Sequence, residues 1–154
     1  MQIRLAGPGD LDRLVGMHAR FCAADGHDFD EEKARQALAP LLDDDRRGLV
    51  WLADDDRGEG YAVVTWGWSV ESGGQDALLD EIYAEPAGRG IGAALLDAIL
   101  AELAARGSVS RIFLETEKDN EAARRLYRRH GFGEEPSVWM SRETNSASAY
   151  PPET

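Results

Sequence analysis

Cysteine and histidine are scarce in this chain, and their scarcity excludes several kinds of site. Cys22 is the only cysteine among 154 residues, so the chain cannot form an internal disulfide or a cysteine-rich metal site. The 3 histidines are scattered along the sequence, and we therefore predict no metal site. The aspartate runs at 43–45 and 54–56 predict solvated loops, because consecutive residues do not easily converge on one ion.

Long apolar runs and an excess of positive charge are also missing. No segment approaches the roughly 18 consecutive apolar residues of a membrane span, and residues 1–5 lack the layout of a signal peptide. We therefore expect a cytoplasmic protein with no membrane partner. The formal net charge of −12 argues against a nucleic-acid partner, because such binders need a basic surface. A small cationic substrate suits this charge, although the need for solubility alone is a sufficient explanation of it.

What is present is the pattern of a single domain over residues 1–142, followed by a polar tail at 143–154 that we expect to be disordered. The first half of the chain predicts two helices and then two strands around a polar turn at 54–60. His18 and Cys22 share the protein-facing side of the first helix.

The second half of the chain alternates between strands and helices. The pattern predicts a strand at 77–85, a helix at 91–106 that ends at Gly107, and a strand at 111–117. A short helix at 120–132 and a last strand at 137–143 follow. Because strands and helices alternate only in this half, we predict an α/β fold of the α+β type, with a mixed sheet flanked by helices.

A glycine-rich turn follows the strand at 77–85, in the stretch DEIYAEPAGRGIGAALL, residues 80–96. Gly88, Gly90 and Gly92 allow a tight turn and let a ligand approach the backbone. The next helix begins without an acidic side chain, so its free N–H groups suit a phosphate, to which Arg89 adds a positive charge. A turn that only reverses the chain needs neither three glycines nor an arginine.

Two classes of phosphate ligand match this turn. Gly88, Gly90 and Ala93 fit the spacing of a dinucleotide fingerprint, with Glu115 as a ribose-binding acid, which would indicate an oxidoreductase. That motif usually opens its fold, whereas here only about 60 residues follow it. Pro86 also lengthens the connection beyond the tight dinucleotide turn. We therefore disfavour the dinucleotide interpretation.

The turn instead resembles the acyl-CoA-binding motif of the GNAT superfamily of N-acetyltransferases. That motif has Arg or Gln, two residues, Gly, any residue, then Gly or Ala; here it spans 87–92, and Ala87 replaces the leading basic residue. The stretch 119–132, DNEAARRLYRRHGF, is similar to the family's second block, which has Asn, Ala, Tyr and Gly-Phe. The strand at 81–86 also looks like the family's strand before the cofactor turn. The resemblance covers roughly residues 2–142.

This resemblance implies a fold, an activity and a set of partners. The fold would be GNAT-like, with a central mixed, mostly antiparallel sheet flanked by helices. The activity would be that of an acyltransferase that moves an acetyl group from acetyl-CoA to a primary amine. The net charge mildly favours a small polyamine as acceptor. A homodimer is plausible by resemblance only.

The resemblance also implies roles for individual residues. Tyr127 would be the general acid, and Glu81 is our first choice of general base, with Asp80, Glu115 and an ordered-water chain as rivals. The strand would lend backbone groups to the pantetheine arm, and the turn would bind the pyrophosphate. The cofactor-binding residues implied in this way are Ile82, Tyr83, Ala84, Arg89, Gly90, Ile91, Gly92, Ala93 and Asn120.

The acceptor site is the part that the sequence defines least. In the family the loop at 25–30 and the strand at 65–74 would border it. Trp66 and Trp68 alternate with Val64 and Val70 on one strand face, which predicts core packing rather than cation–π contact with an amine. Acetylation of a protein N-terminus or lysine stays open, as does a module that senses acyl-CoA without turning it over.

Overall fold

The structure is a computed structural model that describes residues 1–145. The predicted disordered tail, 143–154, therefore lies mostly outside the described residues. The described chain forms five strands and four α-helices, with one short 3-10 turn. In chain order the elements are β1 (Gln2–Leu5), the 3-10 turn (Pro8–Asp10), α1 (Leu11–Asp25), α2 (Glu31–Asp43), β2 (Gly48–Asp55), β3 (Gly58–Ser69), β4 (Gly74–Glu85), α3 (Ile91–Arg106), β5 (Ile112–Leu114) and α4 (Glu121–Arg129).

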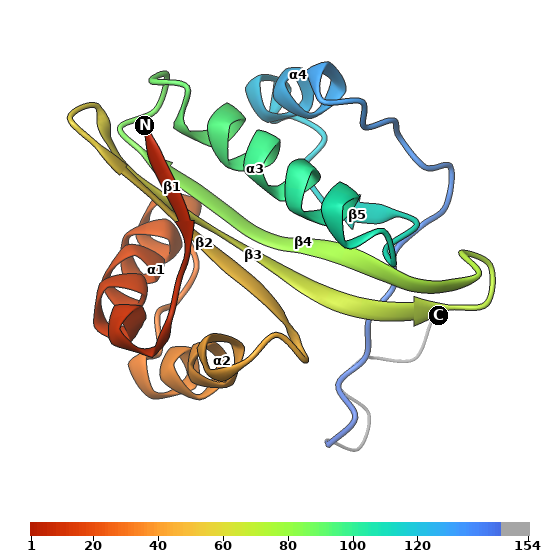
Figure 1. The fold of residues 1–154 in the computed structure, drawn as a ribbon, viewed down its shortest axis with the longest axis horizontal. Coiled ribbons are helices and arrows are strands. Elements are labelled where there is room, and N and C mark those ends of the chain that lie inside the picture. The colour runs from red at the N-terminus through yellow and green to blue at the C-terminus, as the bar shows by residue number, and fades with distance from the viewer. Residues whose placement is uncertain (146–154) are drawn as a thin grey trace, which may run out of the picture.

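The strands form one sheet in the order β1-β2-β3-β4-β5, as Figure 1 shows. The first four strands pair antiparallel, and only β4 and β5 run parallel. Helices α1 and α2 cover one face of the sheet, while α3 and α4 lie on the other face (Figure 1). This confirms the predicted mixed, mostly antiparallel sheet flanked by helices.

The central strands are buried on both faces, so their successive side chains enter two separate cores. The core between the sheet and α3 consists of Leu49, Trp51, Ala53, Ala62, Val64, Ala77, Leu79, Ile91, Leu95, Leu96, Ile99 and Leu103. The core beneath α1 and α2 consists of Leu14, Val15, Met17, Leu38, Leu42, Val50, Leu52, Tyr61 and Val63. Two helical layers therefore hold β4 between them.

A β-bulge interrupts the pairing of β3 with β4. Val64 pairs with Leu79 and Val63 pairs with Glu81, so Asp80 is the extra residue of the bulged strand. Because the bulge shifts the alternation of side chains by one residue, Glu81 faces α1 and α2 rather than α3. Asp80 and Glu81, although consecutive, therefore both reach the same side of the sheet.

Strands β4 and β5 pair over a short distance only. The parallel ladder joins residues 77–79 to residues 112–114 and then stops. Within the described residues no strand pairs with Asp80–Glu85 on the β5 side. The backbone of this part of β4 therefore presents an open edge, which we call the β4 notch.

Two expectations about apolar segments are wrong. Residues 137–143 do not form a strand, and Val138, Trp139 and Met140 are exposed, because no strand of the described chain receives them. Trp68, expected to pack in the core, is 81% exposed, because the β3–β4 hairpin extends beyond the helices that cover the sheet. Trp66 is partly buried and donates its indole N–H to the carbonyl of Asp45 at 2.7 Å.

Candidate active site

Glu81 lies at the bulge, and two side chains hold its carboxylate. The hydroxyl of Tyr61 donates a hydrogen bond to Oε1 at 2.7 Å, and Nδ1 of His18 lies 2.9 Å from the same oxygen. Among the described residues none hydrogen bonds to Oε2. One oxygen of Glu81 is thus fixed by the protein, while the other is free to accept a proton.

Cys22 helps to fix the orientation of His18. Its sulfur lies 3.4 Å from Nε2 of His18, one helical turn away on α1. Burial, and then the nearby carboxylate of Glu81, raise the pKa of the Cys22 thiol, which keeps its proton. The carboxylate of Glu81 can only accept, so the Nδ1–H of His18 donates to it, and the Cys22 thiol contacts Nε2 on the other side of the ring.

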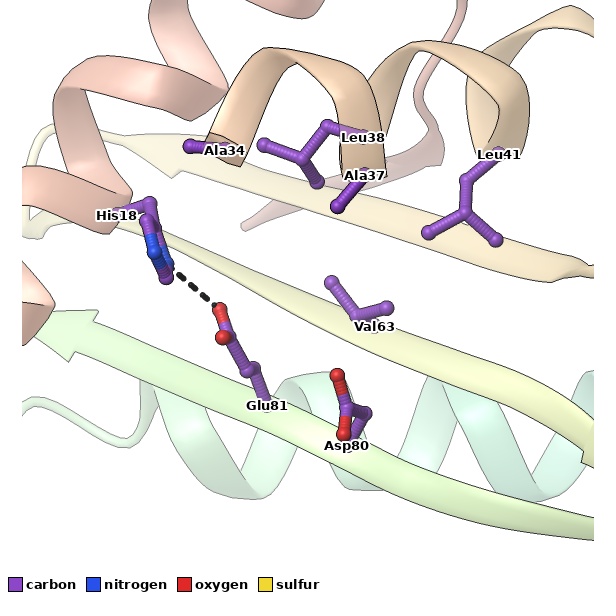
Figure 2. A pocket seen from close by; sticks show the side chains of 8 residues that line it. All are labelled: His18, Ala34, Ala37, Leu38, Leu41, Val63, Asp80 and Glu81. Carbon is purple, nitrogen blue, oxygen red and sulfur yellow. Dashed lines mark hydrogen bonds and ion pairs between the residues drawn. The ribbon is translucent and has the colours of Figure 1, made fainter. Parts of the chain in front are cut away.

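A cavity of about 70 Å³ adjoins Glu81 between β4 and α2. Figure 2 shows His18, Asp80 and Glu81 on the side of α1 and β4, and apolar side chains of α2 on the opposite side. The cavity is lined by His18, Ala34, Ala37, Leu38, Leu41, Val63, Asp80 and Glu81. The cavity thus combines a carboxylate pair at one end with an apolar wall at the other.

Asp80 differs from Glu81 in its surroundings. No described residue hydrogen bonds to its carboxylate, and Asp80 is exposed to solvent. The protein atoms around it nevertheless raise the pKa of Asp80 above its usual value, and the charge of Glu81 raises it further. Asp80 is therefore a carboxylate that a cation beside it would stabilise.

Tyr127 lies on the other face of the sheet, on α4. Its ring packs against the core of α3 and meets Phe132 edge-on, with the ring centroids 6.0 Å apart. Burial raises the pKa of Tyr127, so the phenol stays protonated at neutral pH. Its hydroxyl has no hydrogen-bond partner among the described residues. The Tyr127 hydroxyl is therefore available as a proton donor to a ligand bound on this face.

The beginning of α3 is open to an anion. Gly88 and Gly90 adopt left-handed backbone conformations, with φ of 79° and 78°, and Gly90 is the N-cap. No side chain caps this helix, its first turn holds no acid, and its first internal hydrogen bond runs from Ala94 to Gly90. The N–H groups of residues 91–93 therefore point out of the helix without an acceptor within it.

The other predicted cofactor-binding residues lie around this helix start. Ile82 and Ala84 turn their side chains to the α3 core, and their backbones run along the β4 notch. Tyr83 points to the opposite face, where its hydroxyl donates to Glu85 at 2.7 Å. Asn120 is the N-cap of α4 and accepts a hydrogen bond from the N–H of Ala123. This capping accounts for Asn120 structurally, and a contact with the cofactor stays a prediction.

The match to a known family decides between the two classes of phosphate ligand. The sequence matches the acetyltransferase (GNAT) family over residues 14–132, which is most of the chain. The chain belongs to this family. As a GNAT acetyltransferase it is an acyltransferase, and the dinucleotide interpretation, which requires a parallel sheet, does not fit the antiparallel pairing of its first four strands.

Solved structures share the GNAT fold of this chain. An integron cassette protein, HFX_CASS3, from the mobile metagenome of Cole Harbour Salt Marsh is 29% identical, with a TM-score of 0.82 over 95% of this chain and 92% of that chain. A protein described as an acetyltransferase from Arthrobacter sp. FB24 is 29% identical, with a TM-score of 0.78 over 93% and 96% of the two chains.

A third structure is similar in fold alone. It is a predicted acetyltransferase from Clostridium acetobutylicum in complex with acetyl-CoA, 20% identical, with a TM-score of 0.75 over 92% of this chain and 95% of that chain. No curated protein sequence matches the chain significantly. None of the helices described over residues 1–145 is long and apolar enough to span a membrane. In the same residues no group of three metal-binding side chains comes together.

Sequence reasoning about this acetyltransferase names Glu81 as a candidate base but misses the residues that hold its carboxylate. The helical pattern places His18 only on a protein-facing side, and it gives Tyr61 no role. A signal for Tyr61 exists, since a tyrosine in a buried strand needs a partner for its hydroxyl. No comparable signal exists for His18, which is separated from Glu81 by 63 residues.

The regions predicted to border the acceptor are only partly near Glu81. From the loop at 25–30, Phe29 lies with its ring centroid 6.0 Å from that of His18. Trp66, in contrast, belongs to the far end of the sheet, where Arg106 stacks over it at 5.5 Å. Glu115, the rival base, directly follows β5 and is exposed.

Proposed function

We propose that this acetyltransferase transfers the acetyl group of acetyl-CoA to a small primary amine, with Glu81 as general base and Tyr127 as general acid. The reaction forms a C–N bond, breaks the C–S bond of the thioester, removes one proton from the amine and adds one to the departing thiolate. The observation that carries the proposal is the carboxylate of Glu81, held through Oε1 by Tyr61 and His18 beside a cavity of about 70 Å³.

The residues around the β4 notch fit acetyl-CoA. The open edge at Ile82–Ala84 offers unpaired backbone groups to an extended pantetheine arm, and the start of α3, with Arg89–Ala93, offers N–H groups to a pyrophosphate. When bound, acetyl-CoA supplies the activated acetyl group. In a chain of net charge −12, these N–H groups and Arg89 supply the local positive potential that an anionic cofactor needs.

The two proton transfers fall to residues on opposite faces of the sheet. Oε2 of Glu81 carries no hydrogen bond from the described residues and takes the proton of the amine, while Oε1 stays anchored. Tyr127, kept protonated by its burial, gives its proton to the thiolate. A backbone N–H of residues 82–84 polarises the acetyl carbonyl. On this proposal the acetyl group is placed at the β4 notch, where the edge of β4 is unpaired and lies between the two faces.

The acceptor is a small amine rather than a protein side chain or N-terminus, because the cavity beside Glu81 is small and partly enclosed by α2. A peptide would extend over the outside of the protein, whereas this cavity has room for a short side chain only. The homodimer expected from the resemblance remains a prediction, which a light-scattering measurement of the molar mass would test.

The direct test measures free-thiol release from acetyl-CoA over a panel of alkyl monoamines, polyamines, amino acids and peptide N-termini. We expect release with a small amine, lowered by about 10²-fold or more in Tyr127→Phe, while calorimetry gives both proteins the same affinity for acetyl-CoA. Binding without release from any amine contradicts transferase activity and supports an acyl-CoA sensor. Release only with peptides supports the protein acetyltransferase alternative.

A further inference from the structure

We propose that the acceptor is a monoamine that carries a short apolar group, and that the cavity discriminates against diamines. This inference rests on the proposed function and names its substrate class. Two features of the cavity carry it: both carboxylates lie at one end of the cavity, and the opposite wall has no polar side chain. The negative net charge of the whole chain favours cations in general, but it gives no information about the polarity of this wall.

The carboxylate end binds one ammonium group. The bulge places Asp80 and Glu81, consecutive in sequence, on the same side of β4. Glu81 is already engaged by Tyr61 and His18, whereas Asp80 has no hydrogen-bond partner among the described residues. Asp80 therefore holds the ammonium, which first gives one proton to solvent at the open side of the cavity, and Glu81 takes the second proton as the neutral amine forms the C–N bond.

The α2 wall binds the part of the acceptor next to the amine. Leu38 is buried, Leu41 is half-buried, and Ala37 lies at the rim. On the same measure one water needs roughly 10–15 Å³, so a cavity of about 70 Å³ has room for about five water-sized groups, which suits a short alkylamine. A second ammonium on the same acceptor would lie against the aliphatic side chains of the α2 wall, where it has no hydrogen-bond partner. Its desolvation there costs free energy, whereas burial of a methyl group against the same wall is favourable.

The test compares two acceptors of equal length, n-butylamine and 1,3-diaminopropane, which differ only in a terminal methyl group or ammonium. We expect kcat/KM to be at least about tenfold higher for n-butylamine, since the second charge must lose its water against the wall. A calorimetric titration of the protein with each amine, without acetyl-CoA, is expected to give the same order of affinity. This second readout does not depend on turnover.

An engineered wall provides the sharpest check. Ala37→Asp adds a carboxylate at an exposed position of α2, where the fold tolerates it, and Ala37→Asn adds a neutral group of the same shape. We expect Ala37→Asp to raise kcat/KM for the diamine, relative to that for n-butylamine, by about tenfold, through pairing with the second ammonium. Ala37→Asn should leave this ratio near that of wild type.

The outcomes separate this inference from the proposed function. A preference of wild type for 1,3-diaminopropane in turnover and in binding overturns the monoamine inference and leaves acetyl transfer intact. Equal use of the two amines, or turnover of other amines in the panel but of neither probe, also overturns it. Failure of every amine, with acetyl-CoA bound, overturns the proposed function itself and the inference with it.

Discussion

The two faces of strand β4 are built on different principles. On the α1 and α2 face, side chains from three elements far apart in sequence meet: His18, Tyr61 and Glu81. On the α3 and α4 face, the groups are mainly backbone: the β4 notch and the first N–H groups of α3. The first face offers a ligand side chains that can vary singly, and the second offers a backbone geometry that glycine permits.

Under the proposed function, this difference places acetyl-CoA on the α3 and α4 face and the amine on the α1 and α2 face. Acetyl-CoA carries phosphates and an extended pantetheine arm, which backbone groups can bind without regard to most side chains. Side chains such as Asp80 and Leu41, in contrast, can change without disturbing the start of α3. Substitutions on one face should therefore alter one substrate and leave the other unaffected.

Removing the proposed base, Glu81, should produce the largest effect. Glu81→Gln retains the size of the side chain and its contacts with Tyr61 and His18 but cannot accept the amine proton. We expect kcat to fall by about 10²–10⁴-fold, with the acetyl-CoA dissociation constant unchanged in calorimetry. Glu115→Gln, at the exposed rival base, is the matched control and should retain wild-type kcat. The reverse pattern would assign the base to Glu115.

Removing one of the hydrogen bonds that hold the carboxylate of Glu81 should have a smaller effect. Tyr61→Phe removes the hydroxyl that donates to Glu81 at 2.7 Å, and we expect kcat to fall about tenfold, with both KM values unchanged. Tyr83→Phe is the matched control, because it removes a hydroxyl of the same geometry that donates instead to Glu85. If both variants lost kcat equally, the Tyr61 hydroxyl would be structural rather than a positioning group for the base.

The same contrast explains what the sequence could and could not predict. The donor face is local: Gly88, Gly90 and the following helix lie within one short stretch, and Gly107 ends that helix in a left-handed conformation, with φ of 69°, as predicted. Such features depend on neighbouring residues, so a single sequence displays them. The second motif likewise indicated Tyr127 from its immediate neighbours.

The acceptor face is not local. Glu81 points toward α2 only because of the bulge at Asp80, and strict alternation from Leu79 would turn it toward α3. The bulge depends on how β3 and β4 pair, and no residue type in the sequence predicts its position. The prediction that Trp68 packs in the core was wrong for a related reason. Alternation shows which side of the sheet a strand residue faces, but not whether a helix covers that part of the strand.

On the donor face, a change of backbone conformation should weaken acetyl-CoA binding alone. Gly90→Ala places a β-carbon at φ 78°, which costs about 1–2 kcal/mol and shifts the N–H groups at the start of α3. We expect the acetyl-CoA dissociation constant to rise about five- to tenfold in calorimetry. Gly107→Ala, with φ 69° at the other end of the same helix, should lose similar stability and keep wild-type affinity. Equal loss of affinity in both variants would reduce the effect to general destabilisation.

The smallest effect concerns the stability of the acceptor face. Surrounding protein raises the pKa of Asp80, so its charged form opposes folding at neutral pH. This cost is fully present above the raised pKa of the folded state and disappears below the unfolded value of 3.8. Asp80→Asn should therefore stabilise the protein at pH 7, by well under 1 kcal/mol because Asp80 retains solvent contact.

Urea unfolding of wild type and Asp80→Asn between pH 3 and pH 7 measures this difference, which should shrink toward zero as the pH falls. Asp56→Asn, at the exposed β2–β3 turn, makes the same change of charge and should show no such trend. A stabilisation of Asp80→Asn that persisted at pH 3 would mean that the side chain acts through packing rather than charge. Asp80→Asn should also raise the KM for n-butylamine while leaving acetyl-CoA affinity unchanged, since a carboxylate that costs stability in the free protein is the group that a bound ammonium would stabilise.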